Sequence, residues 1–220
     1  MQIEGLSWFP GHMTKTKRMI VSEIGHMDAV CEIVDARIPQ SSRNPDVDEL
    51  TAGKPRLMVL GIPNVGKSTF INKVAKRKTA RAEDRPGVTR SKQWVPVDAT
   101  LELLDTPGIL WPKFDDTEVG KRLAFTGAIK DDVLDIEELA CYLMDYLAAH
   151  YADVLRERYR IDVEEGDSGY ELLEKAGRKR GFLMRGAQVD TERMARILLD
   201  EFRGGKLGRF TLETVEDCGK

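Results

Sequence analysis

The sequence predicts an α/β fold built on a parallel sheet and followed by a small all-α C-terminal domain. Three observations lead to this prediction. A glycine-rich loop at residues 61–68 lies between an apolar β-forming run and a segment with helical spacing. Other short strand-like segments precede residue 105, and helical patterns replace them from about residue 129 onward. We therefore expect two domains, at residues 1–130 and 131–220.

The first 60 residues are expected to form one long helix and two strands. Trp8–Met13 is predicted to be an aromatic turn, and Thr14–Gly25 a basic amphipathic helix. Ala29–Asp35 is apolar and β-branched, which is typical of a buried parallel strand. Arg56–Leu60 is expected to be the strand that enters the glycine-rich loop. Because ligands bind at the carboxyl ends of strands in open α/β sheets, Asp35 marks a candidate site.

The glycine-rich loop, Gly61-Ile62-Pro63-Asn64-Val65-Gly66-Lys67-Ser68, matches the pattern G-x-x-x-x-G-K-[ST]. A strand before it and a helix after it are what a phosphate cradle requires. Lys67 is expected to face solvent in the empty site and to reach the β- and γ-phosphates of a bound nucleotide. We also assign it a catalytic role. Ser68 would hold Mg²⁺. The loop predicts binding of a nucleotide triphosphate, with contacts from Asn64, Val65, Gly66, Lys67, Ser68 and Thr69.

Two segments after the loop have the features of a nucleotide switch. The predicted strand Leu101–Leu104 ends in Asp105-Thr106-Pro107-Gly108, where Asp105 would be a Mg²⁺ ligand and the Gly108 N–H would approach the γ-phosphate. Together with the loop, this motif favours a GTPase-type switch over most other phosphate-loop enzymes. Thr89, in a polar segment rich in Arg and Lys, is a third candidate Mg²⁺ ligand, although its spacing fits an ordinary loop threonine equally well.

The C-terminal part has the apolar spacing of helices. Four are expected, at Asp135–His150, Tyr151–Tyr159, Ser168–Lys179 and Asp190–Phe202. Two of them end in basic clusters, Lys175/Arg178/Lys179/Arg180/Arg185 and Arg203/Lys206/Arg209. Such clusters are usually solvated surface, but they would also suit contacts with RNA phosphates, and charge alone does not separate the two interpretations.

Composition limits the class of protein. The 220 residues are 41% hydrophobic and 32% charged, which is typical of a globular chain and not of a disordered one. No apolar run approaches the roughly 18–20 residues of a membrane span, so we expect no membrane association. The isolated cysteines Cys31, Cys141 and Cys218 suit a reducing cytoplasm better than a disulfide scaffold or a zinc site. A cytoplasmic monomer is expected.

Several motifs together resemble those of one family. They are Trp8-Phe9-Pro10-Gly11-His12-Met13, Asp35-Ala36-Arg37-Ile38-Pro39, the glycine-rich loop and Asp105-Thr106-Pro107-Gly108-Ile109. The combination resembles the circularly permuted GTPases of bacterial ribosome assembly, most closely the RbgA (YlqF) group, over nearly the whole chain. The resemblance implies a GTPase that acts late in assembly of the large (50S) ribosomal subunit, binds its rRNA and hydrolyses GTP to GDP when docked.

The resemblance also implies roles for two residues. Ile109 stands where many GTPases have a glutamine that orients the attacking water, and an apolar side chain cannot replace it. The family is thought to use the histidine of the Trp-Phe-Pro-Gly-His-Met segment, here His12, whose imidazole can orient a water at neutral pH. Asn64 resembles the loop asparagine through which some GTPases recruit K⁺.

One departure from the family pattern concerns the base. The family recognises guanine through Asn-Lys-x-Asp, and this sequence has no such motif. In the family, a strand like Lys54–Leu60 ends in that motif, and a second strand leads into the phosphate loop. Here one strand serves both purposes, as if the chain were joined between Leu60 and Gly61. The missing part corresponds to about two strand–helix units, roughly sixty residues.

Two explanations of this departure remain open. Either the printed sequence omits a segment of a longer protein, or the chain is a deletion variant with an impaired base site. We favour the omission, which predicts that Leu60 and Gly61 lie apart in different strands.

The leading hypothesis is therefore a ribosome-assembly GTPase. Two alternatives remain: an RNA-binding assembly factor that is insensitive to nucleotide because its guanine site is damaged, and a phosphate-loop ATPase or kinase that never needed the motif.

Overall fold

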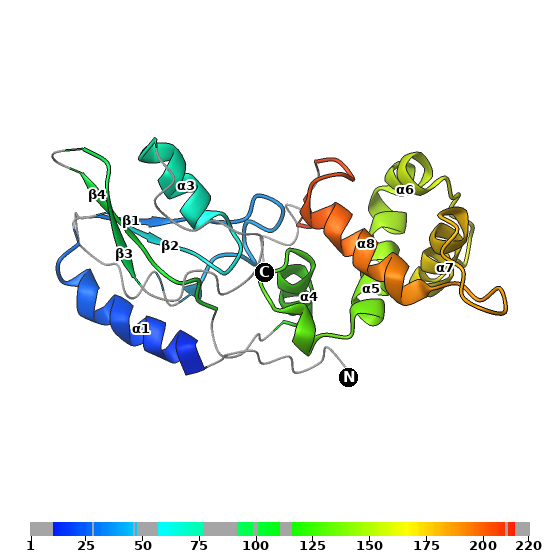
Figure 1. The fold of residues 1–220 in the computed structure, drawn as a ribbon, viewed down its shortest axis with the longest axis horizontal. Helices are drawn as coiled ribbons and strands as arrows, with labels where there is room; N and C mark the ends of the chain where they lie inside the picture. The colour runs from blue at the N-terminus through cyan, green and yellow to red at the C-terminus, as the bar shows by residue number, and fades with distance from the viewer. Residues whose placement is uncertain are drawn as a thin grey trace. The chain divides into compact units, whose positions relative to one another are not determined.

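The computed structural model describes residues 11–27, 29–45, 47, 57–76, 92–98, 101–110, 116–209 and 211–213. They form two compact units, both drawn in Figure 1. The α/β unit comprises described residues within 2–123, 127–130 and 211–220, and the helical unit those within 124–126 and 131–210. The change of unit near residue 130 is close to the predicted boundary. The expectation that every residue after 131 belongs to the helical domain is wrong for Thr211–Glu213, which pack in the α/β unit.

A four-stranded sheet lies at the centre of the α/β unit. Its strands are β1 (Ala29–Glu32), β2 (Leu57–Leu60), β3 (Gln93–Pro96) and β4 (Glu102–Asp105). The order is β1-β2-β4-β3. β2 is parallel to both neighbours, with Val59 opposite Cys31 on one side and opposite Asp105 on the other. β3 is antiparallel to β4 after a turn in which the Leu101 N–H donates to Asp98 Oδ1 at 2.9 Å.

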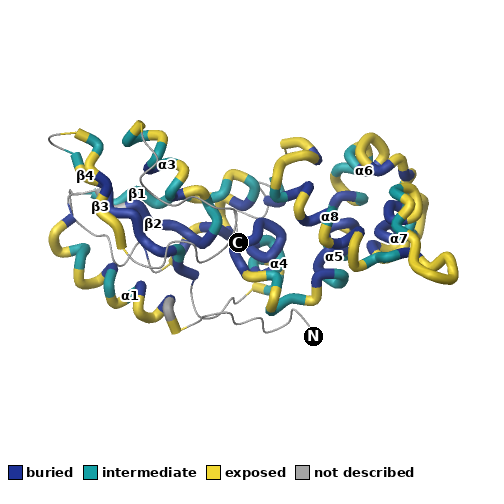
Figure 2. The backbone as a smooth tube through the Cα atoms, in the orientation of Figure 1, coloured by how far each residue is buried: buried dark blue, intermediate teal, exposed yellow. Residues whose placement is uncertain are grey.

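Two helices cover opposite faces of this sheet (Figures 1 and 2). They are α1 (Gly11–Ile24) and α3 (Lys67–Val74). Successive residues of a strand point to opposite faces, and β2 follows this rule. Leu60 packs in one apolar cluster with Ile20 of α1, and Val59 packs in another with Ile71 of α3. The residues of β1 are only half-buried, so the expectation of a fully buried strand there is wrong.

Helix α1 starts earlier than expected. Gly11, His12 and Met13 belong to the helix, although the sequence analysis placed them in a turn. The signal was Pro10, because proline is favoured at the beginning of helices and Gly11 follows it directly. Along the helix, Ile20 is buried and Lys15 is exposed, as the amphipathic pattern predicts.

Three helices of the helical unit begin at residues whose side chains are suited to N-caps. The unit contains η1 (Asp131–Val133), α5 (Ile136–His150), α6 (Ala152–Tyr159), α7 (Gly169–Lys179) and α8 (Thr191–Arg203), while α4 (Thr117–Phe125) precedes it. Asp135 caps α5 and Asp190 caps α8 through their side chains. Ser168 and Glu171 form a reciprocal capping box at α7. None of the described helices is long and apolar enough to cross a membrane.

A buried carboxylate stabilises this unit. Glu201 of α8 accepts hydrogen bonds from Arg158, Tyr159 and Arg180. Burial alone would raise the pKa of Glu201, but these donors and the two positive charges outweigh it and lower the pKa to about 2. The carboxylate is therefore charged at neutral pH, and Arg180, which is half-buried, is one of its partners.

The join at Leu60–Gly61 differs from its prediction. β2 passes directly into the phosphate loop, with Leu60 accepting the Ile33 N–H at 2.9 Å and Gly61 following with a φ of 148°. The two residues are consecutive in one chain, so the prediction that they lie in different strands is wrong. The family pattern has one strand that ends in the guanine motif and another that leads into the phosphate loop. Here β2 takes the place of both, and it pairs with β1 on one side and β4 on the other.

Candidate phosphate-binding and switch site

The glycine-rich loop connects β2 to α3 in a conformation suited to an anion. Gly66 precedes α3 with a φ of 91°, and Asn64 also has a positive φ, of 60°. The first N–H groups of an α-helix have no partner within the helix, so the start of α3 presents donors and the positive end of the helix dipole. The loop brings together the six residues predicted to bind phosphate, Asn64, Val65, Gly66, Lys67, Ser68 and Thr69.

Lys67 folds back onto its own loop. Its Nζ donates to the carbonyl oxygens of Gly61 at 3.1 Å and Ile62 at 2.8 Å, and the residue is 6% exposed. The expectation that this side chain faces solvent is wrong, because the two loop carbonyls provide acceptors for the ammonium group. Burial lowers the pKa of Lys67 to about 8, and the negative charge of Asp105 opposes this shift.

Ser68 and Asp105, both predicted to hold Mg²⁺, are joined by a hydrogen bond. Ser68 Oγ donates to Asp105 Oδ2 at 3.0 Å. Asp105 is buried, and its Oδ1 has no hydrogen-bond partner among the described residues. Burial raises the pKa of Asp105, while the hydrogen bond from Ser68 and the charge of Lys67 lower it. A hydroxyl beside a carboxylate with an unpartnered oxygen fits Mg²⁺, which prefers oxygen ligands and retains several waters.

The segment after β4 packs directly on the phosphate loop. A Cβ atom at Gly108 would lie 2.5 Å from Pro63 Cα, so this close approach requires glycine. The next residue, Ile109, donates its N–H to the Gly61 carbonyl at 3.3 Å and buries its side chain in the cluster around Ile20. Gly108 and Asp105 therefore both lie against the loop, at the same end of β2 and β4.

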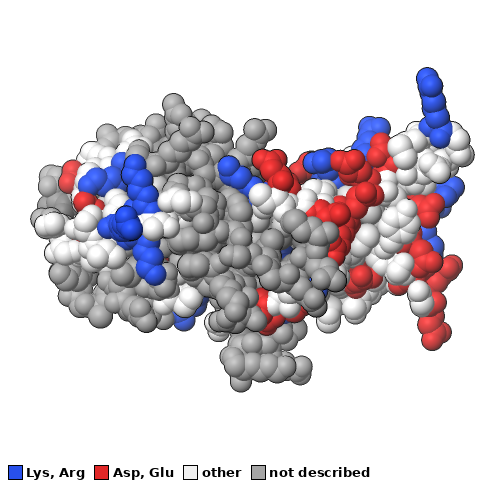
Figure 3. All heavy atoms as spheres, turned by 90° about the horizontal axis from the view of Figure 1, so that it is seen from below, with Lys and Arg blue, Asp and Glu red and all other residues white. Residues whose placement is uncertain are grey.

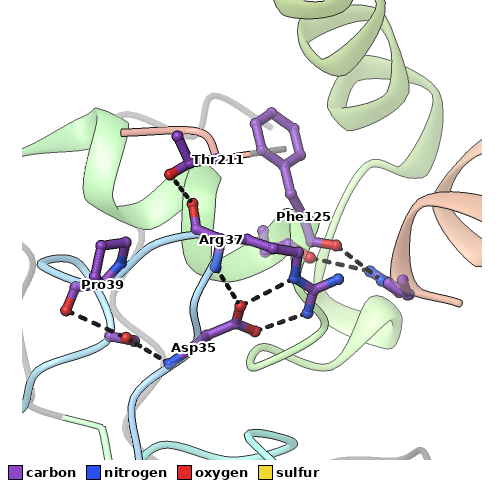
Figure 4. A network of polar contacts seen from close by, with 8 residues as sticks. Asp35, Arg37, Pro39, Phe125 and Thr211 are labelled. Atoms are coloured by element: carbon purple, nitrogen blue, oxygen red, sulfur yellow. Dashed lines mark hydrogen bonds and ion pairs between the residues drawn. The ribbon is translucent and has the colours of Figure 1, made fainter. Parts of the chain in front are cut away.

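Asp35, the candidate at the end of β1, has a local partner (Figure 4). Its Oδ1 accepts from the backbone N–H and Nε of Arg37 at 2.9 and 3.0 Å, and its Oδ2 accepts from Nη2 at 2.7 Å. Ser42 Oγ accepts the Asp35 N–H. The carboxylate thus shapes the loop that follows β1.

Asn44, at the far end of that loop, was not predicted as a site residue. Asn44 is 2% exposed, and its Nδ2 donates to the Ile109 carbonyl at 3.4 Å. Its backbone N–H donates to Glu32 Oε1 at 2.9 Å. The only local signal was a polar residue before Pro45. This pattern predicts the end of a loop but does not predict which residues Asn44 contacts.

Two predicted site residues cannot be compared with the geometry. Thr89 lies outside the described residues. His12 lies in the first turn of α1, but its side chain is outside what the structure describes. Their proposed roles therefore remain predictions.

Known proteins are similar to this chain over nearly its whole length. Residues 56–175 match the family model of the 50S ribosome-binding GTPase. Ribosome biogenesis GTPase A of Bacillus cereus is 39% identical over 284 residues, which cover 98% of this chain and 96% of that protein. The corresponding protein of Priestia megaterium is 38% identical, with 97% and 98% covered. Because 284 aligned positions exceed the 220 residues here, the B. cereus protein carries residues without a counterpart in this chain.

The fold also matches a solved structure. GNP-bound YlqF from T. maritima superposes with a TM-score of 0.60 at 22% identity, covering 92% of this chain and 99% of that one. This likeness supports the fold, and the sequence matches show the family. The chain belongs to the 50S ribosome-binding GTPases and is a phosphate-loop GTP hydrolase.

Proposed function

We propose that this GTPase acts in late assembly of the large ribosomal subunit. It would bind pre-50S particles through their rRNA, as a cytoplasmic monomer, and hydrolyse GTP to GDP and phosphate while docked. The observation that carries the proposal is the similarity to ribosome biogenesis GTPase A across 98% of the chain. The helical unit would supply much of the RNA contact.

The proposed site holds GTP or GDP and a magnesium ion. Ser68 and Asp105 would hold Mg²⁺, and Thr89 is proposed as a further ligand. The ion would neutralise charge on the β- and γ-phosphate oxygens. The unpartnered Asp105 Oδ1 supports this assignment. We propose in addition that Asn64 helps to recruit K⁺.

His12 is proposed to orient or accept a proton from the attacking water. Ile109 cannot do so, because its side chain is apolar and 2% exposed. Ile20, on the same helix as His12, packs in the cluster that contains Ile109, so α1 lies against the switch segment.

Replacing His12 with alanine should therefore reduce turnover without reducing affinity. Loss of a general base lowers kcat by about 100- to 10,000-fold, while the Kd for GTP should stay within about twofold. Single-turnover hydrolysis and equilibrium binding separate the two effects. His26→Ala is the matched control, because this histidine is exposed in the turn that follows the same helix. If His12→Ala weakens binding and leaves kcat unchanged, the proposed role is wrong.

Many of the basic residues of the helical unit have local partners. Arg178 pairs with Glu174 at 2.7 Å, and Lys175 pairs with Asp167 at 2.8 Å. Arg180 binds Glu201, and Arg203 binds Asp131. These contacts make the four cations poor candidates for RNA binding, because each would have to exchange a partner it already has.

The remaining basic residues are better candidates. Lys179, Arg185, Lys206 and Arg209 are exposed and form no ion pair within the described part of the chain. Figure 3 shows acidic side chains over much of the visible helical unit and a gathering of Lys and Arg on the α/β unit. On the face seen in Figure 3, RNA contact by the helical unit would therefore rest on individual cations.

The proposal is tested by GTP turnover with and without purified large ribosomal subunits. We expect subunits to bind the GTP-loaded protein and to accelerate hydrolysis. Subunit binding that ignores nucleotide would instead support the nucleotide-insensitive assembly factor. No binding to mature or precursor subunits would contradict a role in assembly.

The same assay identifies the RNA contacts. Lys179→Gln combined with Arg185→Gln should weaken subunit binding and reduce the slope of log affinity against log salt by about two, roughly one for each phosphate that is no longer neutralised. Arg156→Gln, which removes an exposed charge already paired with Asp153 and Asp162, should change neither quantity. An unchanged slope in the double variant would show that these cations are only solvated surface.

A further inference from the structure

The C-terminal segment Thr211–Glu213, called here the C-terminal clasp, is bound to the loop after β1. The Leu212 N–H donates to the Arg37 carbonyl at 2.7 Å. Thr211 Oγ1 donates to the same carbonyl at 2.9 Å (Figure 4). Leu212 is fully buried. The chain thus returns from the helical unit to the α/β unit and ends its described part on a loop more than 170 positions earlier.

Glu213 makes the most specific contacts of the clasp. Its Oε2 accepts the Gln40 N–H at 2.7 Å, and its Oε1 accepts the Ser41 N–H at 2.8 Å. Arg122 of α4 lies 3.6 Å from Oε1, and the Glu213 side chain is 1% exposed. A buried carboxylate is costly unless its charge is paired and hydrogen-bonded, and these three partners meet that need. The loop at Gln40–Ser41 is consequently held by both oxygens of one side chain.

The other end of the same loop reaches the switch segment. Asn44 is three residues beyond Ser41 and donates from Nδ2 to the Ile109 carbonyl. Ile109 in turn donates its N–H to Gly61 of the phosphate loop. Hydrogen bonds at the two ends of the short backbone segment from Ser41 to Asn44 therefore connect Glu213 to Ile109, and Ile109 to the phosphate loop.

We propose that Glu213 is a positioning residue for the nucleotide switch: by fixing Gln40 and Ser41, it holds Asn44 where it restrains Ile109. The proposal rests only on nucleotide binding at the phosphate loop, and not on any ribosomal role.

The restraint on Ile109 matters because the preceding residue, Gly108, is packed tightly against Pro63. The Gly108 backbone lies too close to Pro63 to accommodate a Cβ atom. Any shift of the Gly108 N–H toward a γ-phosphate would therefore also shift Ile109, the next residue in the chain. The Asn44–Ile109 hydrogen bond, at 3.4 Å, is the longest of the set and the easiest to exchange. GTP and GDP would thus differ in how strongly they displace the loop that Glu213 holds. Because linkage is reciprocal, the clasp must also bias the choice between the two nucleotides.

A first test needs no substitution. Amide hydrogen exchange at Gln40 and Ser41, measured by NMR on the full chain, is compared between the complexes with GDP and with a non-hydrolysable GTP analogue. These two amides report directly on their bonds to Glu213. We expect their protection to differ by at least about fivefold between the complexes. Equal protection in both would overturn the proposal.

The second test is Glu213→Gln. A carboxamide keeps the size of the side chain but turns one acceptor into a donor that faces a backbone N–H, so the clasp should release. The ratio of the Kd values for GDP and the GTP analogue should change by about fivefold or more. Glu213→Asp, which keeps the carboxylate, should have a ratio between those of Glu213→Gln and the wild type. Glu165→Gln, an exposed glutamate of the helical unit, removes the same charge and should leave the ratio unchanged.

The outcomes separate a switch role from a structural one. If the clasp were merely structural, Glu213→Gln would weaken the binding of GDP and of the GTP analogue equally, or would weaken neither. A ratio of Kd values within twofold of the wild-type ratio, measured in a variant whose Gln40 and Ser41 amides have lost their protection, would therefore overturn the proposal. If Glu213→Gln does not fold, the comparison of the two wild-type complexes decides alone. Failure to bind either nucleotide in the wild-type chain would instead contradict the phosphate-loop assignment.

Discussion

Replacing Lys67 with alanine is expected to weaken binding of GTP and GDP by roughly 30- to 4,000-fold, the effect of truncating one partner of a buried charge contact. The side chain is buried among loop carbonyls, so its ammonium lies within the loop that is predicted to hold the phosphates. No neighbour in the loop can replace that charge, since the remaining contacts come from backbone N–H groups. Equilibrium titration with a fluorescent GDP analogue measures the loss.

The pKa of Lys67 adds a second signature. Because this pKa is lowered to about 8 without nucleotide, the ammonium is largely charged at pH 7 and loses its proton as pH rises through 8. Phosphate favours the charged form, so affinity should be highest below pH 8 and should fall above it. In Lys67→Ala this part of the pH dependence should disappear.

Lys73→Ala on the same helix is the control for both measurements, because Lys73 is exposed. Since Lys67 also donates to two carbonyls, the thermal stability of both variants should be recorded. Wild-type affinity in a folded Lys67→Ala variant would exclude the loop as the phosphate site.

The second large effect concerns the base. A site built to hydrogen-bond a particular group rejects an analogue without it by about 10,000- to 100,000-fold. These 220 residues contain no Asn-Lys-x-Asp, and β2 enters the phosphate loop directly. We therefore expect GTP and ATP to bind with Kd values within about tenfold of each other, a loss of most of that discrimination.

Competition of GTP, ATP and GDP against one labelled nucleotide measures this preference. Ribosome biogenesis GTPase A of Bacillus cereus, assayed in parallel, is the natural comparison because it contains residues that this chain lacks. A preference for GTP as large in this chain as in that protein would show that other residues recognise guanine here.

Local signals in the sequence predicted much of the fold. Three of the expected helices begin at Asp135, Ser168 and Asp190, and these residues cap α5, α7 and α8, because capping depends on residues only three positions apart. The start of α1 was missed because Trp8–Met13 was interpreted from its aromatic residues, although Pro10 already favoured a helix start.

The site was predictable where a motif fixes its geometry. The phosphate-loop pattern placed Lys67 and Ser68, and a strand followed by Asp-x-x-Gly placed Asp105 beside them. The burial of Lys67 was not predictable, because it depends on the direction of two backbone carbonyls. Glu213 gave no signal, since its partners at Gln40 and Ser41 lie 173 and 172 positions away and contribute backbone groups that any residue has.

The double use of β2 restricts how a guanine-binding segment can be restored. Inserting strand–helix units between Leu60 and Gly61 must supply a new strand that enters Gly61, because that strand has to lie beside β4. Leu57–Leu60 would then be displaced from the centre of the described sheet to the margin beside β1, the side of the sheet that β3 does not occupy. The four residues are Leu, Met, Val and Leu, so they suit a central or a marginal place equally. A chimera with the inserted segment is thus expected to exchange strands without any change to the original residues of β2.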